Sequence, residues 1–405
     1  MQSIKTLYKI GVGPSSSHTM GPAFAAEIVK KRHPDAEAYE ITLFNSLALT
    51  GEGHLTDFAI GKVLDENKTS FKRIINNQLH PNHILFKVII AGERIAKYEF
   101  NSIGGGDIEE IGVEREEPVN VYPHSTFDQI KEFCKNENIT LYEYIIRFEG
   151  TEILTYLDKV YEAMVASIKR GLKTKGVLPG PLQVERRAHL LSKTRMKNEP
   201  NEIKENRLVS AYAFAVNEEN AAGGLIVTAP TCGGAGVLPS VLYYMDNKYD
   251  FLTKNRILEG LAVAGLIGLL IRENASISGA VAGCQAEVGS ATAMAAAAHA
   301  AMFRLPIDQI EYAAEIALEH SLGLTCDPVD GYVQIPCIER NAVGAMRAIN
   351  ACGLAMVLTE SSKITFDMVV KTMYQTGLDM DIKYKETARG GLAHFYRKDD
   401  DSLIK

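Results

Sequence analysis

Apolar residues recur along this chain with two different periods, and the change between them divides the sequence in two. In the first part, runs of β-branched and aromatic residues predict strands at residues 38–50, 83–93 and 94–107. Apolar residues at helical spacing predict helices at residues 19–32 and 55–67. We therefore expect a small α+β domain over residues 1–150.

The second part has the period of a helix from about residue 127 onward. Helices are predicted at residues 151–172, 255–274, 289–304 and 306–324, after a helical connector at 134–150. Several of them are rich in alanine and glycine, and small residues let helix axes approach closely in the middle of a bundle. The predicted fold class is α+β, with the small N-terminal α+β domain followed by a larger all-α domain over residues 151–405.

Composition narrows the class of protein. The 405 residues are 46% apolar and carry a formal charge of -7, which disfavours nucleic-acid binding. The one basic run, residues 186–197, is interpreted as a solvated loop. The most apolar run, residues 260–271, has 12 residues where a bilayer span needs about 20, so we expect a buried helix and no membrane association. The start of the chain has a lysine but no apolar run of a secretory signal, which favours a cytoplasmic protein.

Four polar segments containing glycine or proline interrupt the helical part, and loops of this length in a helical domain are usually functional. They are residues 217–239, 276–290, 324–342 and 383–392.

Two of these segments contain the cysteines Cys284, Cys326 and Cys337. Each alone would be interpreted as an inert core thiol, but a core thiol has little reason to lie in a polar loop. Three thiolates without histidine suit zinc or an iron-sulfur cluster. Structural zinc would want a fourth ligand and usually Cys-x-x-Cys spacing, and neither is evident. Three cysteines holding a four-iron cluster would leave one iron open to act as a Lewis acid on a substrate oxygen.

A second polar constellation lies near the N-terminus. The segment GVGPSSSHTMGP, residues 11–22, precedes a helical pattern, so hydroxyls and backbone N–H groups could receive a carboxylate there. A serine-rich helix cap without a ligand is the alternative. His18 in this segment and His54 in a glycine-containing turn form a candidate acid–base pair. The glycine segments match neither dinucleotide nor P-loop spacing, and a pyridoxal-phosphate site stays a minor alternative.

Eight segments together resemble the bacterial iron-sulfur-dependent L-serine dehydratases, in the form that has both family domains on one chain. They are GVGPSSSHT, SIGGGD, GVLPG, NEENAAGG, TAPT, GCQAEVG, GLTCDPVDGYVQIPCIERNA and KYKETARGGL, and the similarity runs from about residue 4 to residue 393. The resemblance implies L-serine as substrate, pyruvate and ammonia as products, and a 4Fe-4S cluster in place of pyridoxal phosphate. It also implies an N-terminal domain related to a regulatory substrate-binding domain of phosphoglycerate dehydrogenases.

The resemblance also implies roles for individual residues. Cys284, Cys326 and Cys337 match the cluster ligands, and His18 and His54 match the active-site histidines. Ser15, Ser16, Ser17 and Thr19 match the substrate-contacting loop of the family. From their place in the polar segments, we also expect Asn220, Thr231 and Arg389 to face the substrate. Because the α-proton of serine is weakly acidic and hydroxide leaves poorly, the elimination needs both a base and an electrophile. We favour His54 as the base and His18 as its partner. Arg340, Lys383 and Lys385 are further anion partners, for which structural ion pairs are the preferred interpretation.

Two features depart from the family pattern. Some members end with a cysteine that reaches the open iron, whereas this chain has no cysteine after Cys352; His394 is a candidate substitute. Cys232 stands where many members carry asparagine, and we expect it to be a neutral loop thiol, with a fourth thiolate as the alternative.

Other functions stay open at this point. A non-catalytic iron-sulfur or serine sensor is one, and the same chemistry on L-threonine or L-cysteine is another, since one methyl group is worth only about 1–3 kcal/mol in discrimination. A homodimer is the expected assembly.

Overall fold

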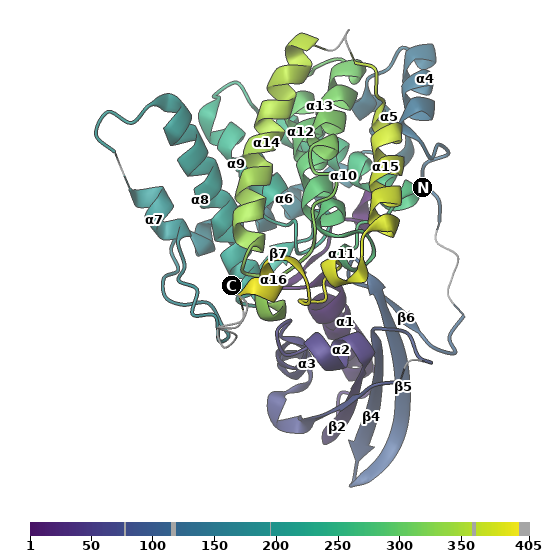
Figure 1. The fold of residues 1–405 in the computed structure, drawn as a ribbon. Coiled ribbons are helices and arrows are strands. Elements are labelled where there is room, and N and C mark those ends of the chain that lie inside the picture. The colour runs from purple at the N-terminus through teal and green to yellow at the C-terminus, as the bar shows by residue number, and fades with distance from the viewer. Residues whose placement is uncertain (77, 115–118, 195, 359–361, 397–405) are drawn as a thin grey trace.

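The computed structural model describes residues 1–76, 78–114, 119–194, 196–358 and 362–396. A β-containing region lies at one end and a larger helical region at the other, as Figure 1 shows. The segment 383–396 and the short helix α16 (Gly391–Phe395) lie where the two regions meet (Figure 1). The predicted class, a small α+β part before a larger helical part, is confirmed.

The β-containing region is built on a five-stranded sheet with the order β3-β2-β4-β5-β6. Its strands are β2 (Ala38–Phe44), β3 (Thr69–Ile74), β4 (His83–Ile90), β5 (Glu93–Gly104) and β6 (Asp107–Glu110). Strands β2 and β3 run parallel and the other pairs are antiparallel. Helices α1 (Gly21–Arg32) and α3 (Thr56–Leu64) share a core with the sheet, which contains Ile41, Phe86 and Phe100.

One strand prediction is wrong over half its length. The strand expected at residues 38–50 ends at Phe44, and residues 45–50 form the helix α2 (Asn45–Thr50). Asn45 has a positive φ of 50°, which asparagine tolerates. The side-chain oxygen of Asn45 accepts a hydrogen bond from the backbone N–H of Asn76 at 2.7 Å. The side-chain amide of Asn45 donates to the backbone carbonyl of Asn76. These hydrogen bonds to a loop hold the chain where it leaves the sheet. Residue propensities along residues 38–50 cannot predict a contact with a separate loop.

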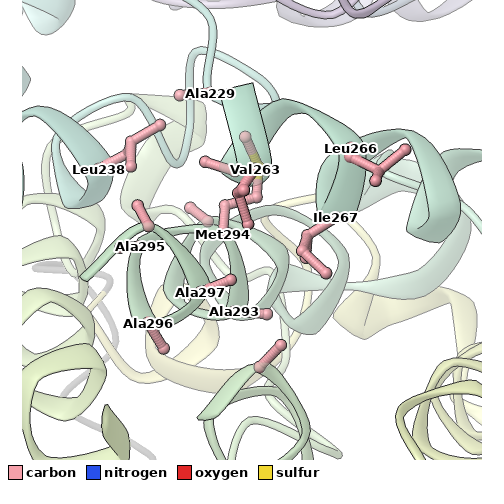
Figure 2. Packing of buried hydrophobic residues seen from close by; sticks show 14 of the residues in the cluster. Ala229, Leu238, Val263, Leu266, Ile267, Ala293, Met294, Ala295, Ala296 and Ala297 are labelled. Carbon is pink, nitrogen blue, oxygen red and sulfur yellow. The ribbon is translucent and has the colours of Figure 1, made fainter. Parts of the chain in front are cut away.

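The helical region is a bundle around two central helices, α10 (Lys254–Asn274) and α12 (Ser290–Met302). All thirteen residues of α12 are buried. Residues 293–298, in the middle of the helix, are all alanine except Met294. Figure 2 shows these small side chains packed beside Val263 and Ile267 of α10. The surrounding helices are α6 (Ile153–Gly171), α8 (Asn201–Ala221), α9 (Val237–Lys248), α13 (Ile307–Glu319), α14 (Cys337–Leu358) and α15 (Phe366–Asp379).

The first residues of the chain belong by packing to the helical region. Ile4, Leu7 and Tyr8 lie in its core, and the Tyr8 hydroxyl donates to the carbonyl of Leu261 at 2.8 Å. Strand β1 (Ile10–Val12) pairs antiparallel with β7 (Leu225–Val227). Helices α4 (Phe127–Glu137) and α5 (Leu141–Glu149) also pack into this core, although they precede the domain boundary expected at residue 150.

Two further segments differ from the interpretation of the sequence. The basic run 186–197 contains the helix α7 (Ala188–Lys193), and Arg186 is buried in an ion pair with Glu219 at 3.0 Å, so this run is not simply a solvated loop. The polar segment 217–239 begins inside α8, which continues to Ala221. The charged and polar composition of both segments predicts exposure to solvent. The first segment instead contains a buried ion pair, and the second begins with buried polar side chains of α8.

Among the described helices, α14 alone is long and apolar enough to cross a bilayer by length and composition. It packs along α8, α12 and α13, which bury the face that carries Ala345, Ala348 and Ala351, whereas Val343 and Val357 are exposed. The run 260–271 that the sequence marked lies within α10 and is buried, as predicted.

We predict that the close approach of α10 and α12 depends on Gly260. A Cβ at this position would lie 2.6 Å from Cγ of Met302 and 2.9 Å from the carbonyl oxygen of Ala298. Gly260→Ala should therefore lower the free energy of unfolding by about 1–3 kcal/mol, measured from the urea midpoint.

The matched control is Gly353→Ala, in the exposed interior of α14, where no atom lies within 4 Å of the new Cβ. This change should raise stability by about 0.5–1 kcal/mol because alanine is the better helix former. Equal effects of the two substitutions would contradict the packing argument.

Candidate active site

Three cysteines from two separate segments of the sequence line one cavity. Cys284 precedes the turn η4 (Gln285–Gly289) that leads into α12, and Cys337 is the first residue of α14. Cys326 is held to the segment 383–392 by a short bridge with Lys385. The other lining residues are Pro14, Ser15, Gly233, Glu287, Asp327, Pro328, Val333, Arg340 and Glu386. The cavity thus joins all four polar segments and the N-terminal serine segment.

The electrostatics of the cavity disfavour free thiolates. Burial raises the pKa of Cys284 to about 11, and the neighbouring Arg340 opposes this rise. Burial first, and then the neighbouring carboxylates and thiols, raise the pKa of Cys326 and Cys337 well above the usual value. The three thiols would lose their protons only to a cationic group placed among them.

This donor set fits an iron-sulfur cluster better than a single metal ion. Within the described residues, no three histidine, cysteine or carboxylate side chains converge closely enough to hold one ion. Cysteines that hold a four-iron cluster each bind a different iron, so they need not converge on a point. Thiolates are the ligands that such clusters take. Cys284, Cys326 and Cys337 are therefore a suitable set of cluster ligands in chemistry and burial.

An ion pair fixes the wall of the cavity. Arg340 donates to Asp327 at 2.8 Å, and the second oxygen of Asp327 accepts from the backbone N–H of Leu392, also at 2.8 Å. Gly391 adopts φ +59°, and a Cβ there would lie 2.1 Å from Asp327 Oδ2. Only glycine allows this approach, so the segment 383–392 is attached directly to the loop that carries Cys326.

The serine segment reaches the cavity because the backbone of Gly13 lies against Asn220. A Cβ on Gly13 would lie 2.0 Å from Oδ1 of Asn220. The amide of Asn220 donates to the carbonyls of Pro14 and Cys232, each at 3.2 Å, and thereby ties the segment to α8. Ser15 caps the following helical turn η2 (Ser16–Met20) by accepting from the N–H of His18 at 3.1 Å. The predicted cap is present, and Ser15 also lines the cavity.

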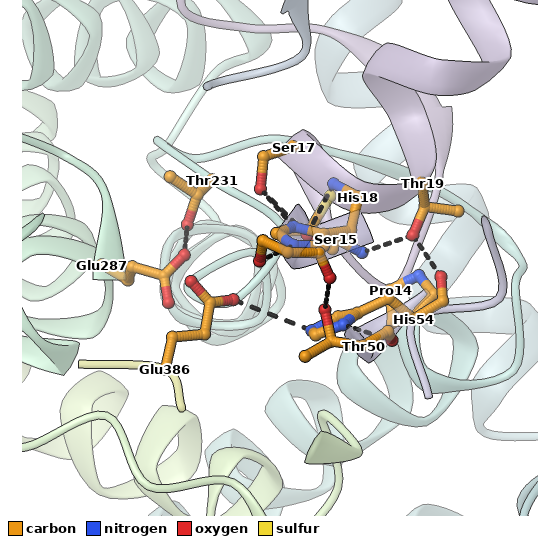
Figure 3. A network of polar contacts seen from close by, with 12 residues as sticks. Pro14, Ser15, Ser17, His18, Thr19, Thr50, His54, Thr231, Glu287 and Glu386 are labelled. Atoms are coloured by element: carbon orange, nitrogen blue, oxygen red, sulfur yellow. Dashed lines mark hydrogen bonds and ion pairs between the residues drawn. The ribbon is translucent and has the colours of Figure 1, made fainter. Parts of the chain in front are cut away.

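The two histidines lie against each other, with ring centroids 4.7 Å apart. Both nitrogens of His18 are engaged, with the hydroxyls of Ser17 at 2.8 Å and Ser46 at 2.9 Å. His54 lies 3.0 Å from the carbonyl of Thr50 through Nδ1, and Thr19 donates to the carbonyl of His54 (Figure 3). A carbonyl accepts only, so Nδ1 of His54 carries the proton and the lone pair is on Nε2.

Two glutamates in the cavity were not among the residues that the sequence suggested. Glu287 accepts from the Thr231 hydroxyl at 2.7 Å, and an oxygen of Glu386 lies 3.7 Å from Nε2 of His54. Figure 3 shows Glu386 between Glu287 and His54. Burial raises the pKa of Glu386 to about 8, with the nearby Glu287 as a second cause. Both residues stand in motif segments, GCQAEVG and KYKETARGGL, but a glutamate in a polar loop is normally a solvated one.

The remaining predicted residues have different positions. Asn220 and Thr231 are buried and act through the contacts described above, and Thr231 touches a cavity residue. Ser16 and Thr19 are buried in η2. Arg389 and His394 are exposed, and neither lines the cavity; Arg340 is the cation at its wall. Cys232 is fully buried and burial raises its pKa, as expected of a neutral thiol.

Comparison with known proteins places the chain in a family. The family model described as "Serine dehydratase alpha chain" matches residues 58–393, and the model described as "Serine dehydratase beta chain" matches residues 3–70. The chain belongs to the serine dehydratase family. The two serine dehydratase models overlap at residues 58–70, inside the β-containing region, so the alpha-chain model also covers strands β3 to β6.

Relatives match over almost their whole length. L-serine dehydratase 2 of Escherichia coli (strain K12) is 39% identical, covering 97% of this chain and 98% of the relative. L-serine dehydratase of Streptomyces coelicolor (strain ATCC BAA-471 / A3(2) / M145) is 38% identical, covering 96% and 98%. The resemblance deduced from the motifs is confirmed.

We predict that His54 makes folding stability depend on acidity. Burial lowers the pKa of His54 to about 4, whereas histidine in an unfolded chain titrates near 6.5. The unfolded chain thus binds more protons between these values, and stability falls as the pH falls from about 6.5 to 4. Between pH 7.5 and 5, His54→Gln should lose about 1–2 kcal/mol less free energy of unfolding than the unsubstituted protein.

Urea unfolding at the two pH values measures this difference. His394→Gln is the control because His394 is exposed, and this variant should keep the original pH dependence. The same loss in both variants would show that His54 is not the group responsible.

Proposed function

We propose that this protein converts L-serine to pyruvate and ammonia by eliminating water. The observation that supports this most strongly is the placement of three cysteines, two buried and one partly buried, in one cavity beside a histidine with a free lone pair. The names of the relatives, L-serine dehydratases, give the substrate.

We further propose that Cys284, Cys326 and Cys337 hold a 4Fe-4S cluster. When bound, such a cluster with one iron free of protein thiolate supplies a Lewis acid for the hydroxyl of the substrate. Arg340 supports this assignment, since its guanidinium faces the Cys284 thiol and would offset negative charge gathered there. Asp327 holds that guanidinium in place.

His54 is suited to remove the α-proton. Its ring is oriented by the Thr50 carbonyl, which also holds the proton on Nδ1. Nε2 is buried and has no hydrogen-bond partner among the described residues, so its lone pair is available to a substrate proton. Because burial lowers the pKa of this ring, His54 is neutral, and able to act as a base, over the whole physiological range.

His18 and the serine segment are suited to position the substrate. Both nitrogens of His18 are hydrogen-bonded to hydroxyls, those of Ser17 and Ser46, and these contacts hold its ring in place. The His18 ring lies against the ring of His54, tilted by 33°, and so helps to hold it in position. Ser15 lines the cavity at the start of η2, where hydroxyl and backbone N–H groups can receive the substrate carboxylate.

Transfer of the α-proton to His54 and departure of the β-hydroxyl, as hydroxide or with a proton as water, leave 2-aminoacrylate. This compound tautomerises to the imine and is hydrolysed by water to pyruvate and ammonia. The enzyme therefore needs to assist only the elimination, which matches a cavity with one base and one site for an electrophile.

The cluster assignment predicts a loss of iron together with activity. Cys284→Ser, Cys326→Ser and Cys337→Ser should each reduce pyruvate formation by about a thousandfold or more after anaerobic reconstitution with iron and sulfide. Iron content and cluster absorption should fall in the same variants. Cys352→Ala, in α14 and outside the cavity lining, should keep both. Full activity of an iron-free, aerobically purified protein would contradict the assignment.

The base assignment predicts a different signature. His54→Gln should lower kcat by about 10²–10⁴-fold while leaving the iron content unchanged, because it removes proton transfer and no cluster ligand. His18→Gln should have a smaller effect on kcat. The reverse order of the two variants would exchange the roles proposed for these histidines.

A further inference from the structure

Glu386 is a carboxylate without a cationic partner in a cavity that takes a charged substrate. Among the described residues, no lysine or arginine forms an ion pair with its side chain, and one of its oxygens lies 3.7 Å from Nε2 of His54. The side chain is 15% exposed and lines the cavity that the three cysteines share. Its oxygens therefore face the space in which the proposed reaction takes place.

The position of Glu386 is fixed by the backbone. Its N–H donates to the carbonyl of Cys326 at 2.9 Å, and the N–H of Cys326 donates to the carbonyl of Tyr384 at 2.8 Å. Glu386 has φ 58°, a left-handed conformation that a residue with a long side chain adopts only when its surroundings hold it there. A freely moving surface loop would relax, so the direction of this carboxylate is part of the folded structure.

The other charged groups at the cavity are already engaged. Glu287 accepts a hydrogen bond from Thr231 at 2.7 Å, and Arg340 is paired with Asp327 at 2.8 Å. A carboxylate that is buried without a cation is costly, and a bound ligand that brings a positive charge would relieve this cost. An α-amino acid carries that charge on its ammonium group, with three N–H donors.

We propose that Glu386 receives the α-ammonium group of the amino-acid substrate. The ammonium nitrogen is one bond from Cα, so an ammonium on Glu386 brings the α-hydrogen to the neighbouring Nε2 of His54. The same contact selects amino acids over hydroxy acids of similar shape. This inference rests on the proposed function, because it assigns a subsite within that reaction.

The test compares ligands with and without the ammonium group. L-serine and 3-hydroxypropanoate share the hydroxyl and the carboxylate and differ in the amino group. In the reconstituted protein, Glu386→Gln should raise KM for L-serine at least about tenfold, as loss of a charge-assisted hydrogen bond does. The inhibition constant of 3-hydroxypropanoate should change less than about twofold, since that ligand has no group for Glu386 to bind.

Asp330→Asn is the matched control. Asp330 also has a positive φ of 49°, is exposed, and lies on the loop between Cys326 and Cys337 without lining the cavity. This variant should leave both constants unchanged. Iron content and cluster absorption, measured in both variants, show whether the cavity is intact.

The outcomes separate the inference from the proposed function. Unchanged KM in Glu386→Gln, or equal weakening of both ligands, would overturn the assignment of Glu386 while pyruvate formation still supports the reaction. If the unsubstituted protein makes no pyruvate, the proposed function fails. Calorimetric binding of L-serine to the unsubstituted and Glu386→Gln proteins then decides the ammonium site alone: weaker binding in the variant supports it, and equal or absent binding overturns it.

Discussion

The placement of three thiols and two glutamate carboxyl groups in one cavity is the constraint that the rest of the structure must satisfy. Each of these groups resists ionisation there, because desolvation raises the pKa of the thiols and of Glu386, and the groups raise one another's further. Such a cavity is stable with its protons on, and it becomes reactive only when positive charge enters it. A cationic cofactor and a substrate ammonium group are the two sources of charge that the surrounding residues suit.

A rigid scaffold holds these groups together. Helix α12 is buried along its whole length and starts directly after the turn η4 that follows Cys284, while Cys337 begins α14. These helices pack closely because alanine and glycine line their contacts. Cys284 and Cys337 therefore stand at helix ends, where helix packing sets their positions, whereas Cys326 lies in a loop that its bridge with Lys385 holds in place. This fits the general need of a reactive site for fixed ligands and an accessible centre.

The two histidines His18 and His54 come from the other region of the molecule. His54 belongs to the turn between α2 and α3, and a Cβ on the neighbouring Gly53 would lie 3.4 Å from the carbonyl oxygen of Gly331, on the cysteine loop. The N-terminal strand β1, paired with β7, and the contact of Gly13 with Asn220 attach this region to the helical bundle. A base from one region and cluster ligands from the other would make catalysis depend on how the two regions are joined.

The sequence by itself determined the two-part architecture, the central helices and the chemistry of the cysteine and serine segments. Periodicity determines these elements because the apolar spacing of α6, α10, α12 and α13 is a local property of each segment. It could not predict that the strand at residues 38–50 would end at Phe44, because the hydrogen bonds of Asn45 come from a distant loop. Nor could it distinguish Glu287 and Glu386 from solvated glutamates, or Arg340 from Arg389. Burial and the identity of a neighbour are properties of the packed chain, and only the tertiary structure decided which charged side chains face the cavity.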